Sequence, residues 1–287
     1  MFPSSAADIY IREYFHNYVT NGHPWAVPLR IISTDRPINL TDPITQMYCC
    51  ISPDQRSFRH PTQAEIDRHH VIITTSMLSK NLKVAPGYFT HIMIDEAAQM
   101  LECEALVPLS YATFETRIVL AGDHMQITPK LFSVGDGQSA DHTLLNRLFQ
   151  FYQKERHEVA MKSRIIFNEN YRSTAGIIEF VSKHFYVGKG NAIQASGNIP
   201  PHPEMYPLVF CHVSGVAERD MSMISWHNTS EIIQVIEKVK EIYQRWPDEW
   251  GVRDLKRICV VSHGTQVCRR TTRSPREGAM HALLTTL

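Results

Sequence analysis

The residues best suited to chemistry in this sequence are two adjacent carboxylates that follow an apolar run. His91-Ile92-Met93-Ile94 is compatible with a β-strand, and Asp95-Glu96-Ala97-Ala98-Gln99 follows it directly. Ligands of α/β proteins bind at the carboxyl ends of sheet strands, so this order places charge where a ligand would bind. The same residues also fit ordinary N-terminal capping of a following helix. The carboxylate pair alone leaves both interpretations open.

Two further stretches carry groups of the kind that nucleotide chemistry needs. Gly122-Asp123-His124-Met125-Gln126-Ile127-Thr128-Pro129 ends another apolar run, and Asn170-Tyr171-Arg172-Ser173 precedes a predicted helix. One carboxylate can hold Mg²⁺ through water, and a second can orient or deprotonate the attacking water. An amide side chain can sense the γ-phosphate, and an arginine can neutralise charge in the transition state. The order and spacing of the three stretches are more specific than any one of them.

These three stretches resemble the motifs of superfamily 1 RNA helicases related to the nonsense-mediated-decay helicase, and most closely the "helicase with zinc finger" family. The Asp-Glu-Ala-Ala-Gln box resembles motif II, and the Gly-Asp-x-x-Gln-x-x-Pro box resembles motif III. The Asn-Tyr-Arg-Ser box resembles the one that opens the second RecA-like domain. Two weaker matches are 4–8, similar to a nucleic-acid-contacting motif, and 71–75, similar to the strand before motif II. The resemblance runs from Ser4 to about Val267.

The resemblance implies an ATP site with Mg²⁺. In it, Asp95 coordinates Mg²⁺ through water and Glu96 is the catalytic base, while Gln99 and Gln126 read the γ-phosphate and the attacking water. Tyr171 stacks on the adenine, and Arg172 reaches across the cleft as an arginine finger. The residues that fall where the family touches the nucleic-acid backbone are Ser5, Thr74, Thr75, Ser262 and His263. Such contacts do not read base sequence.

For some of these residues a structural interpretation stays open beside the functional one. Tyr171 and Arg172 fit an aromatic residue at a domain seam with a surface arginine. Thr74 and Thr75 also fit plain strand-end residues.

Two parts of the family pattern are missing from the printed sequence. It contains no Gly-x-x-x-x-Gly-Lys-Ser/Thr, the Walker A loop whose backbone N–H groups and lysine hold the phosphates. After Ser262-His263-Gly264-Thr265-Gln266 the expected late motifs are replaced by an unpatterned segment. We therefore expect a truncated helicase core that is weak or inactive on its own, with an incomplete sheet, an exposed strand edge and poor solubility.

The order of predicted elements indicates an α/β fold. Strands and helices alternate, as in parallel sheets with right-handed crossovers. We predict helices over 4–19, 62–68, 101–111, 140–155, 173–184 and 229–243, and strands over 28–33, 46–51, 71–76, 91–94, 117–123, 208–212 and 258–262. With the resemblance, this implies two RecA-like P-loop NTPase domains with parallel sheets, both incomplete. The predicted domains are 1–160 and 161–268, followed by a disordered tail over 269–287.

Composition narrows the class of protein. The 287 residues contain 29 Lys and Arg and 29 Asp and Glu side chains, so the net charge gives no indication of nucleic-acid binding. Six scattered cysteines without a Cys-x-x-Cys pair are typical of reduced thiols inside the cell, and the fifteen histidines lack zinc-site spacing. No signal peptide and no apolar run of about 20 residues is found, so we expect an intracellular protein, cytoplasmic or nuclear, without a membrane segment.

Three functions remain in competition. The first is an ATP-dependent RNA helicase core that binds single-stranded RNA in preference to DNA. The second is a non-catalytic module, derived from a helicase, that binds RNA or a protein partner. The third is a metal-dependent nuclease using Asp95, Glu96 and Asp123, in which Gln126 and the Tyr171-Arg172 pair would have no role.

Overall fold

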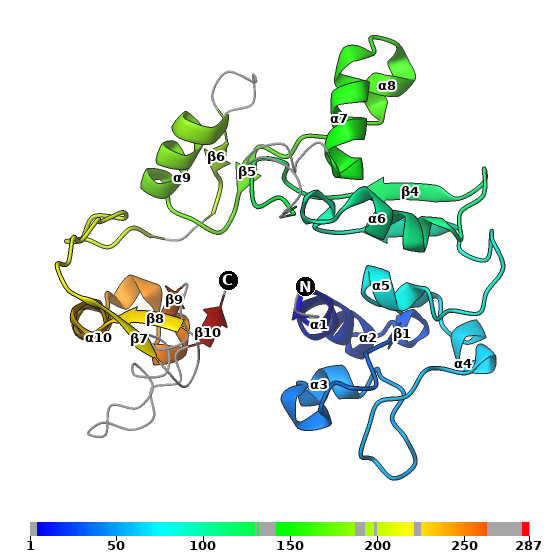
Figure 1. The fold of residues 1–287 in the computed structure, drawn as a ribbon, viewed down its shortest axis with the longest axis horizontal. Coiled ribbons are helices and arrows are strands. Elements are labelled where there is room, and N and C mark those ends of the chain that lie inside the picture. Colours follow the sequence, from blue (N-terminus) through cyan, green and yellow to red (C-terminus); the bar gives the residue numbers. More distant parts are fainter. Residues whose placement is uncertain are drawn as a thin grey trace. The chain divides into compact units, whose positions relative to one another are not determined.

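The computed structural model describes residues 5–129, 131, 142–186, 193–197, 200–220, 225–262 and 283–286 (Figure 1). The chain divides into two compact units, Met1–Ile165 and Ile166–Leu287. We predict the domain boundary slightly earlier, between residues 160 and 161. In the described part the fold is mixed α/β, and each sheet consists of two strands.

The first unit begins with one continuous helical run. It consists of α1 (Ser5–Ile9), the π-helical segment η1 (Tyr10–Phe15) and α2 (His16–Thr20). The backbone keeps right-handed helical angles at both junctions, and Ile11 is fully buried. The run ends before Gly22, whose φ of 107° is rare in residues that have a side chain. This agrees with the helix predicted over 4–19.

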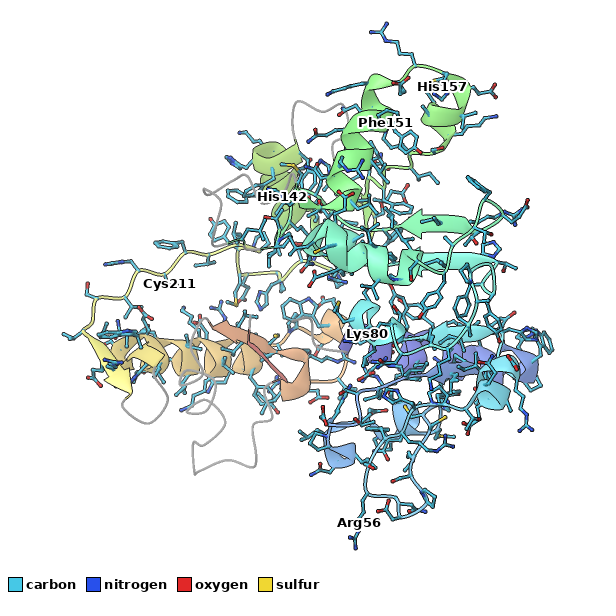
Figure 2. The ribbon with its side chains drawn as sticks, turned by 45° about the vertical axis from the view of Figure 1, so that its right-hand side comes forward. Arg56, Lys80, His142, Phe151, His157 and Cys211 are labelled. Carbon is cyan, nitrogen blue, oxygen red and sulfur yellow. The ribbon has the colours of Figure 1, made fainter. Side chains whose placement is uncertain are left out.

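The first sheet pairs two short parallel strands, β1 (Pro28–Arg30) and β2 (Val71–Ile73). The helical segments around and between them are η2 (Pro24–Ala26), η3 (Ile38–Leu40), α3 (Pro43–Gln46) and α4 (Gln63–Asp67). Thr62 and Glu65 form a capping box at the start of α4, and Ile66 of α4 packs with Leu29 of β1 in a buried cluster. Figure 2 shows Arg56 on the loop that joins α3 to α4. The predicted strand over 46–51 contributes only isolated bridges.

The second sheet pairs β3 (His91–Ile94) with β4 (Arg117–Leu120), again in parallel. The surrounding helices are α5 (Ser76–Ser79), η4 (Ala97–Gln99), α6 (Glu102–Leu109), α7 (Leu144–Lys154) and α8 (Glu158–Lys162). One face of β3 is buried: Ile92 and Ile94 join a core cluster with Ala105 of α6 and Leu144 of α7. The other face is open, since Met93 is 72% exposed.

The second unit is built from short elements. β5 (Glu169–Asn170) pairs in parallel with β6 (Gln194–Ala195), and α9 (Ala175–Val181) continues into η6 (Ser182–Tyr186). The strands β7 (Ala217–Asp220) and β8 (Ser225–Asn228) are antiparallel and lead into α10 (Thr229–Gln244), η7 (Asp248–Trp250) and η8 (Leu255–Arg257). β9 (Cys259–Ser262) pairs in parallel with β10 (Leu283–Thr286).

Three features of the second unit differ from the sequence prediction. The prediction of parallel sheets throughout was wrong for β7 and β8. These two strands are neighbours in sequence and pair with each other in antiparallel orientation. The predicted strand over 208–212 is irregular chain on which Cys211 lies (Figure 2), and Leu208, Val209 and Phe210 are exposed, so no packing stabilises a strand there. In the predicted tail, residues 283–286 form β10; residues 269–282 and 287 lie outside the described part.

None of the helices in the described part of the chain has the length and apolar character that a bilayer crossing needs.

Candidate active site

The register of the second sheet brings two of the predicted motifs to the same edge. Ile94 is paired with Leu120, so Asp95 and Asp123 follow neighbouring parallel strands. Beyond the strands, the Ala121 N–H donates to the Ile94 carbonyl, and the Ala97 N–H donates to the Ala121 carbonyl, both at 2.8 Å. Strand ends tied in this way hold their following loops in a fixed relation. The motif II and motif III stretches are therefore adjacent, and each follows a strand.

Gly122 allows the two loops to approach so closely. A Cβ at this position would lie 2.9 Å from the Ala98 nitrogen, a distance that real Cβ atoms essentially never show, and 3.0 Å from the Ala97 nitrogen. Only glycine lets the two backbones meet at this distance. Sequence reasoning missed this role of Gly122, for which a glycine at the end of a strand was the available signal.

Asp95 is exposed directly after β3, and it accepts a hydrogen bond from a residue that is distant in sequence. The Tyr10 hydroxyl donates to Asp95 Oδ2 at 2.7 Å. This hydrogen bond is the main reason that the pKa of Tyr10 is raised to about 12, with burial and the negative charge of Asp95 adding to it. The hydroxyl is thus protonated, and a donor, at neutral pH. Sequence reasoning missed Tyr10, since no local pattern connects it with Asp95.

Glu96 adopts a backbone conformation that is unusual for a residue with a side chain. Its φ and ψ are 54° and 33°, in the left-handed region, which costs on the order of 1–3 kcal/mol in a non-glycine residue. Its exposed carboxylate accepts a hydrogen bond from Gln99 Nε2 at 2.6 Å. The structure thus brings two predicted residues together, with Gln99 bonded to the predicted base.

Gln126 is held by a residue that we had not included among the site residues of the ATP hypothesis. Gln126 Nε2 donates to Asp123 Oδ2 at 2.9 Å, while the Met125 N–H donates to Asp123 Oδ1 at 2.9 Å. Asp123 therefore shapes the turn and fixes the amide of Gln126. An aspartate that begins a turn after a strand is a recognisable signal for this role.

The donor set at this edge suits a cation that takes few protein ligands. In the described part of the chain, no three His, Cys, Asp or Glu side chains gather as a metal cage. Mg²⁺ in nucleotide sites typically uses one or two carboxylates and fills its other positions with water and phosphate oxygens. Within the described residues, Asp95 Oδ1 receives no hydrogen bond, so that oxygen is available to a hydrated ion.

Tyr171 and Arg172 lie in the second unit, directly after β5. Asn170 Oδ1 accepts hydrogen bonds from the Arg172 N–H at 3.0 Å and the Ser173 N–H at 2.8 Å, which makes a tight turn after β5. Tyr171 is 67% exposed, and its hydroxyl donates to Glu169. This hydrogen bond to a carboxylate raises the pKa of Tyr171. Both predicted side chains are therefore exposed at one turn.

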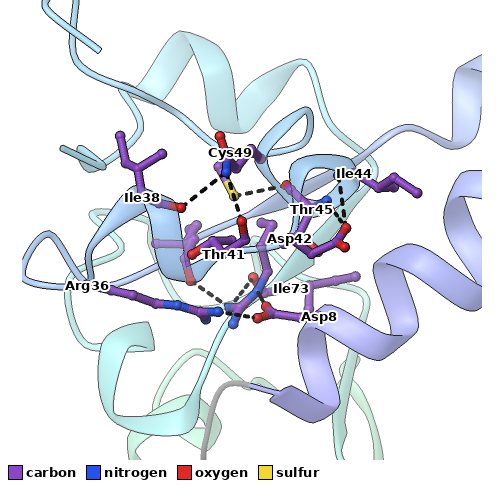
Figure 3. Close-up of polar contacts among 12 residues, drawn as sticks. Asp8, Arg36, Ile38, Thr41, Asp42, Ile44, Thr45, Cys49 and Ile73 are labelled. Atoms are coloured by element: carbon purple, nitrogen blue, oxygen red, sulfur yellow. Dashed lines mark hydrogen bonds and ion pairs between the residues drawn. The ribbon is translucent and has the colours of Figure 1, made fainter. Parts of the chain in front are cut away.

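A buried ion pair ties the helix that begins at Ser5 to the first sheet. Arg30 is 1% exposed; its Nε lies 3.0 Å from Asp8 Oδ1 on α1, and its guanidinium donates to the Ile73 carbonyl at 3.4 Å. Arg36 contacts Asp8 Oδ2 at 2.7 Å (Figure 3). Burial lowers the pKa of Arg30, and the charge of Asp8 opposes that effect. The helix that begins at Ser5 is thus tied to the end of β2, immediately before Thr74.

The individual side chains predicted to contact nucleic acid are less uniform. Thr74 Oγ1 is shielded from solvent and has no hydrogen-bond partner in the described part of the chain. Thr75 precedes α5 without capping it through its side chain. Ser5 and Ser262 are the first residue of α1 and the last of β9, and only their backbone is described. His263 lies outside the described residues.

Comparison with known proteins identifies the class. Two family models, each described as an AAA domain, match residues 42–134 and 141–273. The first match contains Asp95, Glu96 and Gln126, and the second contains Tyr171 and Arg172. Together with relatives that are named helicases, these matches show that the chain belongs to the superfamily 1 helicases with AAA domains.

Two of the relatives align with more than nine-tenths of the chain, and a third aligns with a little over half of it. "3'-5' exoribonuclease HELZ2" of Homo sapiens is 61% identical over 264 residues, which cover 92% of this chain and 9% of that protein. "Probable helicase with zinc finger domain" of Danio rerio is 40% identical over 271 residues, covering 93% and 14%. "RNA helicase Mov10l1" of Homo sapiens is 30% identical over 191 residues, covering 59% and 16%. The chain thus spans a small part of each of these relatives.

Proposed function

We propose that this chain forms part of the core of an ATP-dependent RNA helicase, with two RecA-like domains and an ATP site at the carboxyl ends of β3 and β4. The observation that carries the proposal is the register that places Asp95 and Glu96 beside Asp123 and Gln126. The relative named an RNA helicase supports RNA over DNA as the nucleic acid. We further propose an intracellular location, cytoplasmic or nuclear.

Each residue has a distinct role in this proposal. Asp95 binds Mg²⁺ through water, Glu96 takes the proton from the attacking water, and Gln126 orients that water. Bound Mg²⁺ supplies neutralisation of the phosphate charge. Gln99 holds Glu96 in place through the 2.6 Å hydrogen bond. In the second unit, Tyr171 would stack on adenine and Arg172 would neutralise transition-state charge.

We expect little hydrolysis from this chain alone, because the sequence contains no Walker A loop. The backbone donors of that loop bind most of the triphosphate, and loss of one such element lowers the rate by powers of ten. The sharp test is therefore binding: Mg²⁺-dependent binding of a fluorescent ATP analogue, compared between the unmodified chain, Asp95→Asn and the surface control Glu158→Gln. Weak binding that only Asp95→Asn abolishes supports the proposal.

Three results would contradict parts of this proposal. Equal binding by Asp95→Asn and the unmodified chain would show that the carboxylate does not serve a nucleotide. Strong RNA-stimulated release of phosphate that is lost in Glu96→Gln would overturn the expectation of weak activity. Binding of single-stranded RNA that ignores both ATP and Asp95→Asn would favour the non-catalytic RNA-binding module.

A nuclease function is not favoured by any observation in the described residues. The exoribonuclease name belongs to a relative of which this chain matches 9%. The Gln99 and Gln126 side chains donate hydrogen bonds to carboxylates at the strand ends. A metal-dependent nuclease mechanism gives these two amides no role. Metal-dependent cleavage of single-stranded RNA remains the direct measurement for it.

A further inference from the structure

Tyr10 connects two parts of the first unit that are 85 residues apart in sequence. It is the first residue of η1, on the helical run that begins at Ser5, and Asp95 directly follows the last residue of β3. The 2.7 Å hydrogen bond between them joins the helix beside the first sheet to the carboxylate edge of the second sheet.

This hydrogen bond restrains a side chain that has few other restraints. Asp95 is exposed, and in the described part of the chain the Tyr10 hydroxyl is the one donor found for its carboxylate. Tyr10 is itself 40% exposed, and its ring lies 5.9 Å from the ring of Tyr14, centroid to centroid. A carboxylate with two oxygens can accept a hydrogen bond at one and present the other to a cation.

We infer that Tyr10 is a positioning residue for the cation site, holding Asp95 Oδ2 so that Oδ1 faces the hydrated metal ion. The inference rests on the proposed function, which assigns Mg²⁺ to Asp95. Partners that orient metal-ligating carboxylates in this way typically change metal affinity by about 10- to 100-fold when removed. Tyr10 supplies the hydroxyl alone, so the effect is expected at the lower end of that range.

The test uses Mn²⁺ as a paramagnetic substitute for Mg²⁺, since both ions favour oxygen ligands. All tyrosines of the full chain are replaced by 3-fluorotyrosine, and the ¹⁹F signal of Tyr14 reports bound Mn²⁺ by its broadening. Tyr10→Phe removes only the hydroxyl. Tyr18→Phe is the matched control on the same helical run, where the ring stacks on His23 at 4.0 Å. Urea unfolding of each variant checks that stability is unchanged.

We expect Tyr10→Phe to raise the Mn²⁺ concentration for half-broadening about tenfold, while Tyr18→Phe leaves it unchanged and Asp95→Asn removes selective broadening. The Tyr10 signal, identified as the one absent from Tyr10→Phe, should also shift in Asp95→Asn without any metal.

The other outcomes separate this inference from the proposal beneath it. If Asp95→Asn abolishes the broadening while Tyr10→Phe behaves like the unmodified chain, the positioning role is wrong and the cation site stands. Tighter Mn²⁺ binding by Tyr10→Phe would also overturn it, because the hydroxyl would then compete with the ion. Broadening that is indifferent to Asp95→Asn would refute the cation site itself, and the role of Tyr10 with it.

Discussion

The two parallel sheets of the first unit use their charged residues in opposite ways. In the β1–β2 sheet all three residues of β1 are buried, and the charge of Arg30 is buried with them against Asp8. In the β3–β4 sheet only alternate residues of β3 are buried, and β4 is mostly exposed. The carboxylates of that sheet, Asp95 and Glu96, lie in solvent and are held by single hydrogen bonds.

This difference separates the charges that stabilise the fold from those that are available to bind a ligand. A buried ion pair is expensive to break, because each partner would remain desolvated without the other. An exposed carboxylate costs little to hold and is free to bind a cation. The contrast predicts that substitutions at the first sheet change stability, whereas those at the second change function and local strain.

The largest effect is expected from Asp8→Asn. This substitution leaves the buried guanidinium of Arg30 without its countercharge, and Arg36 loses the same partner. We expect the free energy of unfolding to fall by about 3 kcal/mol, measured by urea denaturation. Glu158→Gln is the control: its pair with Lys162 at 2.6 Å is fully on the surface, so the change should stay below about 0.5 kcal/mol. A loss for Asp8→Asn no larger than that of the control would refute a structural role for the pair.

A smaller effect of the opposite sign is expected from Glu96→Gly. Glycine adopts a φ of 54° without strain, so the substitution should raise the free energy of unfolding by about 1 kcal/mol. Glu96→Gln keeps the strain and should leave stability unchanged.

Gln55→Gly provides a reference outside the site. Gln55 also has a left-handed φ, of 57°, on the loop that carries Arg56 (Figure 2). A similar gain there would show that thermal stability responds to the backbone conformation itself. A loss of stability in Glu96→Gly, beside a gain in Gln55→Gly, would contradict the interpretation of Glu96 as a strained residue.

The placement of the carboxylates at strand ends was predictable from sequence because its signals are local. An apolar strand followed by Asp95-Glu96, and a second followed by Gly122-Asp123, place polar groups at strand ends whatever the rest of the chain does. Likewise, α10 follows from apolar residues at helical spacing after a capping Asn228, whose side chain accepts from the Ser230 and Glu231 N–H groups.

The contacts that restrain the site were not predictable, because they join residues without a shared pattern. Asp8 and Arg30 are 22 residues apart, and Tyr10 and Asp95 are 85 apart. Only the folded chain brings such pairs together. The apolar run 208–212 shows the converse: its residues favour a strand, yet they are exposed and form none, because β-propensity without tertiary packing does not stabilise a strand.

An effect of about the same size as that of Glu96→Gly separates two ion pairs, one near each sheet, by their dependence on pH. Arg59 binds Glu65 through two hydrogen bonds, of 2.8 and 2.5 Å, and Glu65 also caps α4. The hydrogen bonds from Arg59 hold the pKa of Glu65 well below its usual range. Because the folded pKa is depressed, the stabilisation is present above about pH 4.5 and is lost as the pH falls further.

Glu65→Gln should therefore lower the free energy of unfolding by about 1 kcal/mol at neutral pH and flatten its decline below about pH 4.5. Glu102→Gln is the matched variant near the second sheet. Arg147 donates two hydrogen bonds to Glu102, at 2.9 and 2.5 Å, and Glu102 does not cap its helix. Its pKa is also lowered by the arginine, but the pair lies on the surface, so the loss should be smaller. Urea unfolding between pH 3 and 7 measures both; equal losses would show that the capping role of Glu65 adds nothing to its ion pair.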